Sequence, residues 1–171
     1  MFVALSIPDT ARSVLQQAMH HYEDHLDRFV PEQNWHITLA WLGSDALSHS
    51  ILPELLKPLP QSFTMTVNIT HVGRGKKPDM LWAYAAPTVA LQKLHQATIE
   101  RLQAMHVPLP QKDSLFIPHI SLGYLSEALK NRGLADQASN VTFPVHQLDV
   151  YESAATLAGQ RYTSIGQIHL K

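Results

Sequence analysis

Two short motifs in the chain carry side chains that are suited to acid and base chemistry. His36 and Thr38 lie in the segment WHITL, and His119 and Ser121 lie in the segment PHISL. Side chains alternate between the two faces of a β-strand, so each histidine and its hydroxyl residue share one face, about 7 Å apart along the strand. Each segment, as a strand, would therefore present an imidazole and a hydroxyl on the face opposite its apolar residues.

The chemistry that suits this set of groups is displacement at a phosphodiester. An imidazole can accept or donate a proton near pH 7, because its unperturbed pKa is about 6.5. In-line attack on phosphorus needs a base at the entering oxygen and an acid at the leaving oxygen, on opposite sides. His36 and His119 could supply both across a groove, and the hydroxyls of Thr38 and Ser121 could donate to the non-bridging oxygens. No metal is needed for this chemistry.

A single motif of this kind carries little information, because a histidine on a half-polar strand is more often structural. Here the extended motif occurs twice, each time before an aromatic residue and a leucine, at Trp41 and at Tyr124. The repeat of the whole motif, once in each half of the chain, indicates a catalytic pair.

The elements that would position the motifs recur in the same order in both halves. Apolar patterning, prolines and glycines predict helices at 11–27, 46–56, 89–105 and 126–138, and strands at 2–7, 35–42, 62–72, 81–85, 114–124, 141–151 and 162–170. Residues 73–79 form a glycine-containing turn between the halves. Pro144 within a predicted strand indicates an edge strand or a bulge.

This order predicts an α+β fold, with residues 1–171 forming a single bilobal domain. We expect two antiparallel sheets, related by an approximate twofold axis, to line a central groove with the helices outside. The lobes would span about 1–79 and 80–171, with the C-terminal strand as a candidate for crossing over. The alternative is an ordinary α+β protein in which the repeated strand-helix-strand pattern has no functional meaning.

Composition limits the partners and the compartment. Thirteen Lys and Arg against fourteen Asp and Glu give a formal net charge of −1, so a nucleic acid would have to be held locally. The chain has no cysteine, which excludes disulfides and Cys-type zinc sites and suits a reducing cytoplasm. No run of residues is long and apolar enough to span a membrane, and the apolar start lacks a basic leader. We therefore expect a cytoplasmic protein, with a monomer as the default.

The chain resembles the two-histidine (2H) phosphoesterase superfamily, and within it the RNA 2',3'-cyclic phosphodiesterases, also called 2'-5' RNA ligases. The resemblance rests on the segments FVALSIP, WHITLAWLG, IPHISLGYL and VYESAATLAGQRYTSIGQIHL. It implies catalysis by His36 and His119, phosphate binding by Thr38 and Ser121, no metal or other cofactor, and a 2'-phosphate product with weak reverse 2'-5' ligation. It also favours His119 as the base and His36 as the acid, an assignment that the residues themselves leave open.

The chain departs from the family pattern at one position. Family members often have an arginine where this chain has Tyr124, so the charge that compensates the phosphate must come from elsewhere. The candidates are Arg74, Lys76 and Lys77 in the turn, and Arg161; a solvated turn and a solvated surface residue are the structural alternatives.

An aromatic side chain could stack on the base of a bound nucleotide. Strict alternation from His36 places Trp35 and Trp41 on the core face, and alternation from His119 does the same for Tyr124 unless the strand bulges or ends. Further aromatic candidates for the groove are Trp82, Tyr84 and Tyr151.

His21 and His25 have the spacing of metal ligands on a helix, but no third ligand accompanies them, which favours a solvated face. The functional hypothesis is therefore an enzyme acting on RNA ends or nucleotides that carry a 2',3'-cyclic phosphate. The alternative is a module of the same fold that binds a nucleotide or an RNA end without turnover.

Overall fold

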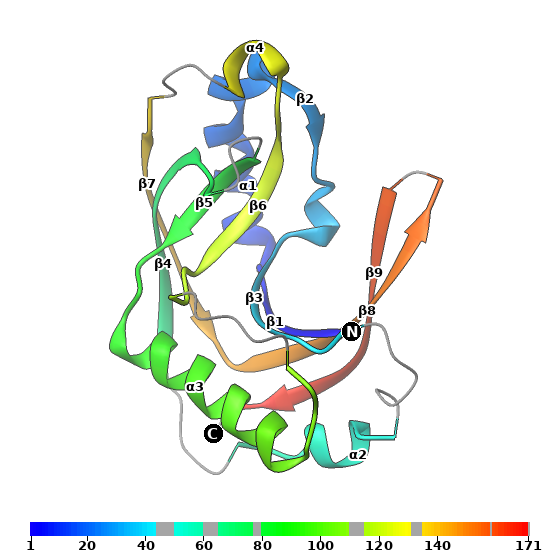
Figure 1. The fold of residues 1–171 in the computed structure, drawn as a ribbon. Coiled ribbons are helices and arrows are strands. Elements are labelled where there is room, and N and C mark those ends of the chain that lie inside the picture. Colours follow the sequence, from blue (N-terminus) through cyan, green and yellow to red (C-terminus); the bar gives the residue numbers. More distant parts are fainter. Residues whose placement is uncertain are drawn as a thin grey trace.

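The computed structural model describes residues 1–43, 50–59, 65–76, 80–109, 115–130, 135–157 and 159–170. Within these residues the strands form two antiparallel sheets (Figure 1). The four-stranded sheet has the order β3-β1-β8-β9, with bounds His36–Trp41, Phe2–Ser6, Gln147–Thr156 and Gly159–His169. The five-stranded sheet has the order β2-β6-β5-β4-β7, with bounds Leu26–Phe29, His119–Leu125, Met80–Ala85, Met65–Arg74 and Gln137–Val145.

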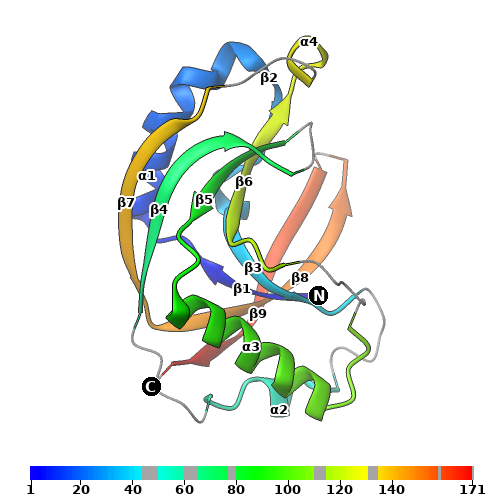
Figure 2. The same cartoon turned by 60° about the vertical axis from the view of Figure 1, so that its left-hand side comes forward.

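The helices lie outside the sheets. Two of them, α1 and α3, each follow a strand of one sheet and contact a strand of the other sheet. Helix α1 (Asp9–Met19) follows β1 of the four-stranded sheet but packs against β7 of the five-stranded sheet. Helix α3 (Val89–Ala104) follows β5 of the five-stranded sheet but contacts β3 and β4. Figures 1 and 2 show α1 beside β7 and α3 at the opposite end of the molecule, near α2 (Leu52–Leu55). The predicted fold class, α+β with two antiparallel sheets in one domain, is confirmed.

Local sequence explains why α3 begins and packs where it does. The hydroxyl of Thr88 accepts a hydrogen bond from the backbone N–H of Leu91 at 3.2 Å, which caps the first turn. The stripe Leu91, Leu94, Thr98 and Leu102 is buried, as its helical spacing predicted. Buried residues of both sheets join in one hydrophobic cluster.

The sheets do not follow the expected lobe boundary near residue 79. Strands β8 and β9 of the second half belong to the sheet of β1 and β3, whereas β2 and β4 of the first half belong to the sheet of β5 and β6. The physical reason for β4 is the short connection to β5, which favours antiparallel pairing of these two strands. Crossing over therefore involves four strands rather than the C-terminal strand alone.

Several predicted elements differ from the observed ones. The helix expected at 11–27 ends at Met19 and is followed by a 3-10 helix, η1 (His20–His25), and by β2, which pairs with the edge of β6. The strand expected at 141–151 divides into β7 and β8 at His146, and that expected at 114–124 begins only at His119. Pro144 lies in β7, an edge strand, as predicted.

Two predicted helices extend beyond the described residues. Within the described part of the chain they appear as α2 and as α4 (Glu127–Lys130), while 46–49 and 131–134 lie outside it. The short 3-10 helix η2 (Glu32–Asn34) leads into β3. Among the helices of the described residues, none is long and apolar enough to cross a membrane.

Candidate active site

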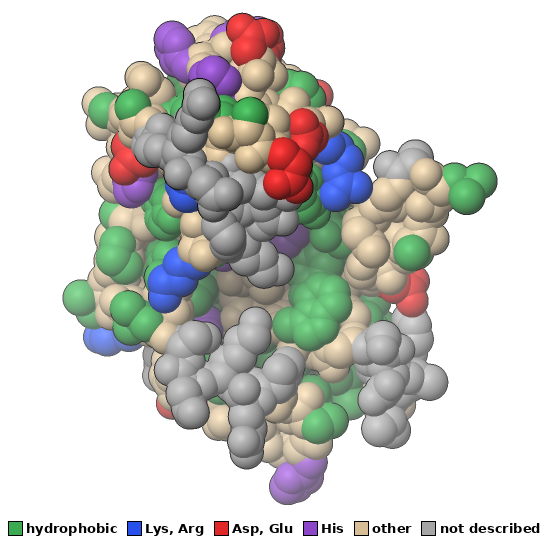
Figure 3. All heavy atoms as spheres, turned by 45° about the horizontal axis from the view of Figure 1, so that its top comes forward, with side chains coloured by type: hydrophobic (Ala, Val, Ile, Leu, Met, Phe, Trp, Pro, Cys, Tyr) green, Lys and Arg blue, Asp and Glu red, His purple; other side chains and the backbone are tan. Residues whose placement is uncertain are grey.

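The two motif strands meet at the centre of the molecule. Strands β3 and β6 contact each other, and a pocket of about 300 Å³ opens over both. Figure 3 shows a hollow on this face, with histidine and hydrophobic side chains within it. The pocket is lined by Val30, Asn34, His36, Thr38, Trp41, Met80, His119, Ser121, Tyr124 and Tyr162. All four residues of the paired motifs, two imidazoles and two hydroxyls, thus face one cavity.

Both imidazoles are oriented by the same backbone contact. Nδ1 of His36 lies 2.7 Å from the carbonyl oxygen of Asn34, and Nδ1 of His119 lies 2.8 Å from that of Ile117. A carbonyl only accepts hydrogen bonds, so each Nδ1 carries a hydrogen and donates it. Nε2 of the neutral ring is then an acceptor, and in His36 it lies 2.9 Å from the hydroxyl of Thr38, which donates to it. Nε2 is thus the atom that can exchange a proton with a ligand.

His36 is neutral in this environment at pH 7. The pKa of His36 is lowered from 6.5 to about 4, chiefly by burial; the hydrogen bond to Asn34 opposes this shift, and the electrostatic effect of His119 adds to it. A buried imidazole without a carboxylate partner resists protonation, because the charged form loses its hydration. The ligand-free site therefore holds His36 in the form that accepts a proton.

Aromatic rings fix the plane of each imidazole, but the two sets of rings differ. His119 stacks on the indole of Trp82, with ring centroids 3.5 Å apart and an interplanar angle of 18°. His36 lies 4.6 Å from the ring of Phe2 and meets the edge of Tyr162 at 5.3 Å. The two histidines thus share a hydrogen-bond pattern but not their immediate surroundings.

Gly75 allows Trp82 to occupy its place behind His119. A Cβ atom at Gly75 would lie 2.6 Å from two carbons of the indole, so no larger residue fits without moving the ring. Trp82 itself is buried at 7% exposure. It therefore supports His119 and does not offer a free face to a nucleobase.

Matching bulges bring Trp41 and Tyr124 to the pocket. Leu39 of β3 has no paired residue on β1, and Leu122 of β6 has no paired residue on β5. Each strand therefore has a β-bulge at this leucine. An extra residue reverses the alternation of the side chains that follow it. Trp41, expected in the core by strict alternation, is instead 44% exposed and lines the pocket, as does Tyr124.

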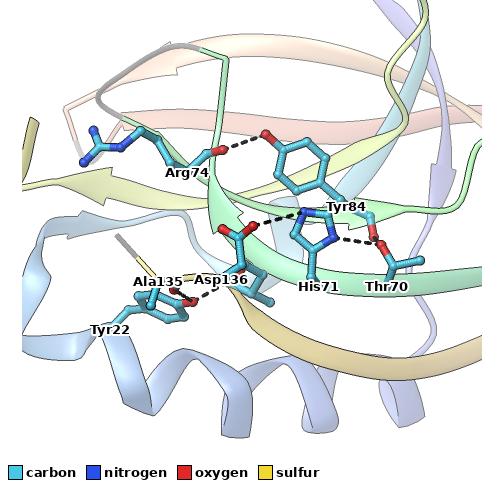
Figure 4. Close-up of polar contacts among 8 residues, drawn as sticks. Tyr22, Thr70, His71, Arg74, Tyr84, Ala135 and Asp136 are labelled. Carbon is cyan, nitrogen blue, oxygen red and sulfur yellow. Dashed lines mark hydrogen bonds and ion pairs between the residues drawn. The ribbon is translucent and has the colours of Figure 1, made fainter. Parts of the chain in front are cut away.

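Three further aromatic residues, Trp35, Tyr84 and Tyr151, do not line the pocket. Trp35 is in the core, as predicted, and its Nε1–H donates to the carbonyl of Val30 at 3.0 Å. Tyr151 stacks on Phe2 at 5.2 Å and does not line the pocket; its ring centroid is 6.2 Å from that of His36. Tyr84 donates a hydrogen bond to the carbonyl of Arg74 at 2.6 Å (Figure 4).

Of the candidate cations from the sequence, those within the described residues do not line the pocket. The guanidinium of Arg74 donates to the carbonyl of Leu129 in α4. Arg161 is exposed, and strand alternation places it opposite Tyr162, whose ring faces the pocket. Lys76 is exposed and absent from the lining, and Lys77 lies outside the described residues.

Sequence reasoning missed several lining residues and a nearby cation. Asn34, Met80 and Tyr162 line the pocket. The guanidinium of Arg28 lies over the ring of Tyr124, 4.1 Å from its centroid. Arg28 directly follows the segment 11–27 that was expected to be helical, so no sequence signal placed it beside the second motif. Tyr162 could have been found from the resemblance of the closing segment.

His21 and His25 do not share the face of an α-helix, because η1 is a 3-10 helix. Across the described ranges, no group of three or more His, Asp or Glu side chains is arranged to hold a metal ion.

A family model described as the 2'-5' RNA ligase superfamily matches residues 8–156, which is most of the chain. The chain belongs to the 2'-5' RNA ligase superfamily. The resemblance to two-histidine phosphoesterases that the motifs indicated is thereby confirmed.

Individual proteins are similar to this chain over almost their full length. The RNA 2',3'-cyclic phosphodiesterase of Escherichia coli K12 is 25% identical over 167 residues, covering 96% of this chain and 93% of the relative. The crystal structure of E. coli LigT complexed with 3'-AMP is similar with a TM-score of 0.80 and 25% identity, over 99% of this chain and 97% of that one. A Thermus thermophilus protein, TT0787, shares the fold, with a TM-score of 0.80 and 20% identity over 99% and 96% of the chains.

Proposed function

We propose that this member of the superfamily hydrolyses 2',3'-cyclic phosphates at RNA ends or on nucleotides, using His36 and His119 as the acid and base. The observation that carries the proposal is the placement of two imidazoles and two hydroxyls around one pocket, with Nε2 of His36 held as an acceptor by its backbone contact. The similarity to an RNA 2',3'-cyclic phosphodiesterase supports the same substrate class.

In the proposed reaction, one imidazole takes a proton from water as the water oxygen attacks phosphorus. The bond from phosphorus to the 3'-oxygen breaks, and the other imidazole gives that oxygen a proton. The product carries a 2'-phosphate and a 3'-hydroxyl. The hydroxyls of Thr38 and Ser121 would donate to the non-bridging oxygens as negative charge builds up on them. If a ribose 5'-hydroxyl attacks phosphorus in place of water, the same two groups would move the protons and the product would be a 2'-5' linkage, which would account for weak ligation.

The state of His36 favours it as the base. Its lowered pKa keeps it neutral at pH 7 in the ligand-free site, and only a neutral imidazole can accept the proton of water. We therefore assign water activation to His36 and protonation of the 3'-oxygen to His119. This is the reverse of the assignment that the motif resemblance favoured.

Trp41, Tyr124 and Tyr162 would contact the nucleoside in the same pocket. Their rings line it beside the motif residues, and a base can stack on any of them whatever its sequence. The E. coli LigT structure with 3'-AMP supports nucleotide binding in this fold. We propose a monomer that acts in the cytoplasm without a metal or other cofactor.

The proposal is tested by incubating the protein with a 2',3'-cyclic mononucleotide and EDTA, and identifying the product isomer. We expect turnover in EDTA with a 2'-phosphate as the only product. Binding without turnover would instead assign the chain to the nucleotide-binding or RNA-end-binding alternative. Turnover that requires a divalent metal would refute the two-histidine mechanism.

A further inference from the structure

Arg28 reaches the pocket through Tyr124. The two residues are paired in the β2–β6 register, and the guanidinium lies 4.1 Å from the centroid of the Tyr124 ring. Val30 follows directly after β2 and lines the pocket, and its N–H donates to the carbonyl of Leu122 in β6 at 2.8 Å, so this segment runs along β6 at the pocket. Both observations put the guanidinium at the rim of the pocket beside β6.

Arg28 lies outside the lining itself, which consists of neutral polar, aromatic and apolar side chains and the two imidazoles. No Lys, Arg, Asp or Glu side chain occurs among the described residues that line it. None of the described carboxylates forms an ion pair with Arg28, which is exposed. A guanidinium stacked on an aromatic ring keeps its N–H edge available for hydrogen bonds to a phosphate.

The size of the pocket determines which phosphate Arg28 can meet. Its volume of about 300 Å³ is at the lower limit of ligand pockets, roughly 300–1,000 Å³, and suits one nucleotide. His36, Thr38, His119 and Ser121 already surround the place of the reacting phosphate. An RNA chain bound by its 3' end must leave over the rim, where the phosphodiester preceding the terminal nucleotide would be the next anionic group.

We propose that Arg28, held by Tyr124, binds the phosphodiester that joins the terminal nucleotide to the one before it. This inference rests on the proposed hydrolysis of cyclic phosphates. It makes the site selective for an RNA end over a cyclic mononucleotide, and it gives the chain a cation beside the position where family members often have an arginine.

The test compares two substrates in wild type and three variants. The substrates are a 2',3'-cyclic mononucleotide and a dinucleotide that ends in the same cyclic phosphate. The variants are Arg28→Ala, Arg28→Lys and, as the matched control, Arg161→Ala, which removes one positive charge from an exposed position on the other side of its strand. Circular dichroism checks that each variant is folded.

We expect Arg28→Ala to lower kcat/KM for the dinucleotide about tenfold or more, as for a lost charge-assisted hydrogen bond, and to leave the mononucleotide unchanged. The slope of log kcat/KM against log salt concentration for the dinucleotide should become shallower by about 0.7, the value for one single-strand phosphate contact. Arg28→Lys should recover only part of the loss, because lysine keeps the charge but not the planar stack. Arg161→Ala should match wild type on both substrates.

Equal losses on both substrates would show that Arg28 serves the reacting phosphate or the scaffold, and would overturn the inference. So would an unchanged dinucleotide rate in Arg28→Ala. If wild type hydrolyses the mononucleotide but shows no preference for the dinucleotide, the proposed function stands and the role of Arg28 fails. If wild type hydrolyses neither substrate, the proposed function itself fails.

Discussion

His36 and His119 are held alike by backbone carbonyls, yet each ring lies in different surroundings. Nδ1 of each donates to the carbonyl two residues earlier, which leaves Nε2 for proton exchange. His36 is buried against Phe2, whereas His119 stacks on Trp82. The face of an indole favours a nearby cation more than a benzene ring does. This difference agrees with the proposed roles of His36 as the base and His119 as the acid.

The acid and base roles can be separated with a leaving group that needs no proton. In a substrate with sulfur in place of the 3'-oxygen, the leaving thiolate is stable without a general acid. We expect His119→Ala to lose much of its defect on this substrate, while His36→Ala keeps its defect, because the base is still needed. Rates of both variants on the oxygen and sulfur substrates provide the measurement. Rescue of His36→Ala alone would reverse the assignment.

The pKa of His36 also predicts how stability depends on pH. Below about pH 6.5 the unfolded chain binds a proton at this residue, while the folded chain does not until about pH 4. The free energy of unfolding should therefore fall as the pH is lowered from 7 to 4, by about 3 kcal/mol from this group alone. Urea unfolding of wild type and His36→Gln across this range isolates the contribution. Parallel curves for the two proteins would contradict the buried neutral state.

At the scale of the elements, the β4–β5 connection supports the second motif. The N–H of Gly75 donates to the carbonyl of Met80 at 2.7 Å. Gly75 also packs on the indole of Trp82, which in turn stacks on the His119 ring. We expect Gly75→Ala to lower stability by about 1–3 kcal/mol through overpacking and to lower kcat as well, because the indole must move. Unfolding and turnover, measured well below the unfolding temperature, test both effects.

Gly166→Ala is a matched control for this variant. A Cβ atom at Gly166 would lie 2.6 Å from Leu56; Gly166 belongs to β9 of the four-stranded sheet, whereas His119 belongs to β6 of the five-stranded sheet. Gly166→Ala should lower stability without lowering kcat. Equal kcat values in both variants would show that the Gly75–Trp82 packing does not position the imidazole.

The elements also show what the sequence could predict. The motif strands and their apolar faces followed from alternation, and the four motif residues do meet at one pocket. The positions of Trp41 and Tyr124 did not follow, because the bulges at Leu39 and Leu122 depend on how β1 and β5 pair with these strands. The position of Arg28 could not be predicted for the same reason, because only the pairing of β2 with β6 brings Arg28 beside Tyr124.

At the scale of the whole molecule, the two halves of the chain exchange strands. The sequence repeat predicted two similar lobes, and both motif strands do lie beside matching central strands. It could not show that β4 and β8 each join the sheet of the other half, because strand exchange leaves the local pattern unchanged. Both sheets and the core that joins them therefore need the entire chain.

This exchange predicts that the chain unfolds as one unit. Residues 1–79 or 80–171 expressed alone should lack stable tertiary structure, since each lacks strands of both sheets. The full chain should show a single urea transition that coincides by far-ultraviolet circular dichroism and tryptophan fluorescence. Cooperative unfolding of either isolated half would contradict this account.

The central claim is that His36 and His119 form an acid and base pair around one phosphate. Its most direct test is single-turnover hydrolysis of a dinucleotide 2',3'-cyclic phosphate in EDTA by wild type, His36→Ala and His119→Ala, with product affinity measured for each. We expect each substitution to lower the rate at least about 100-fold while the 2'-phosphate product still binds. A rate within tenfold of wild type in either variant would contradict the claim.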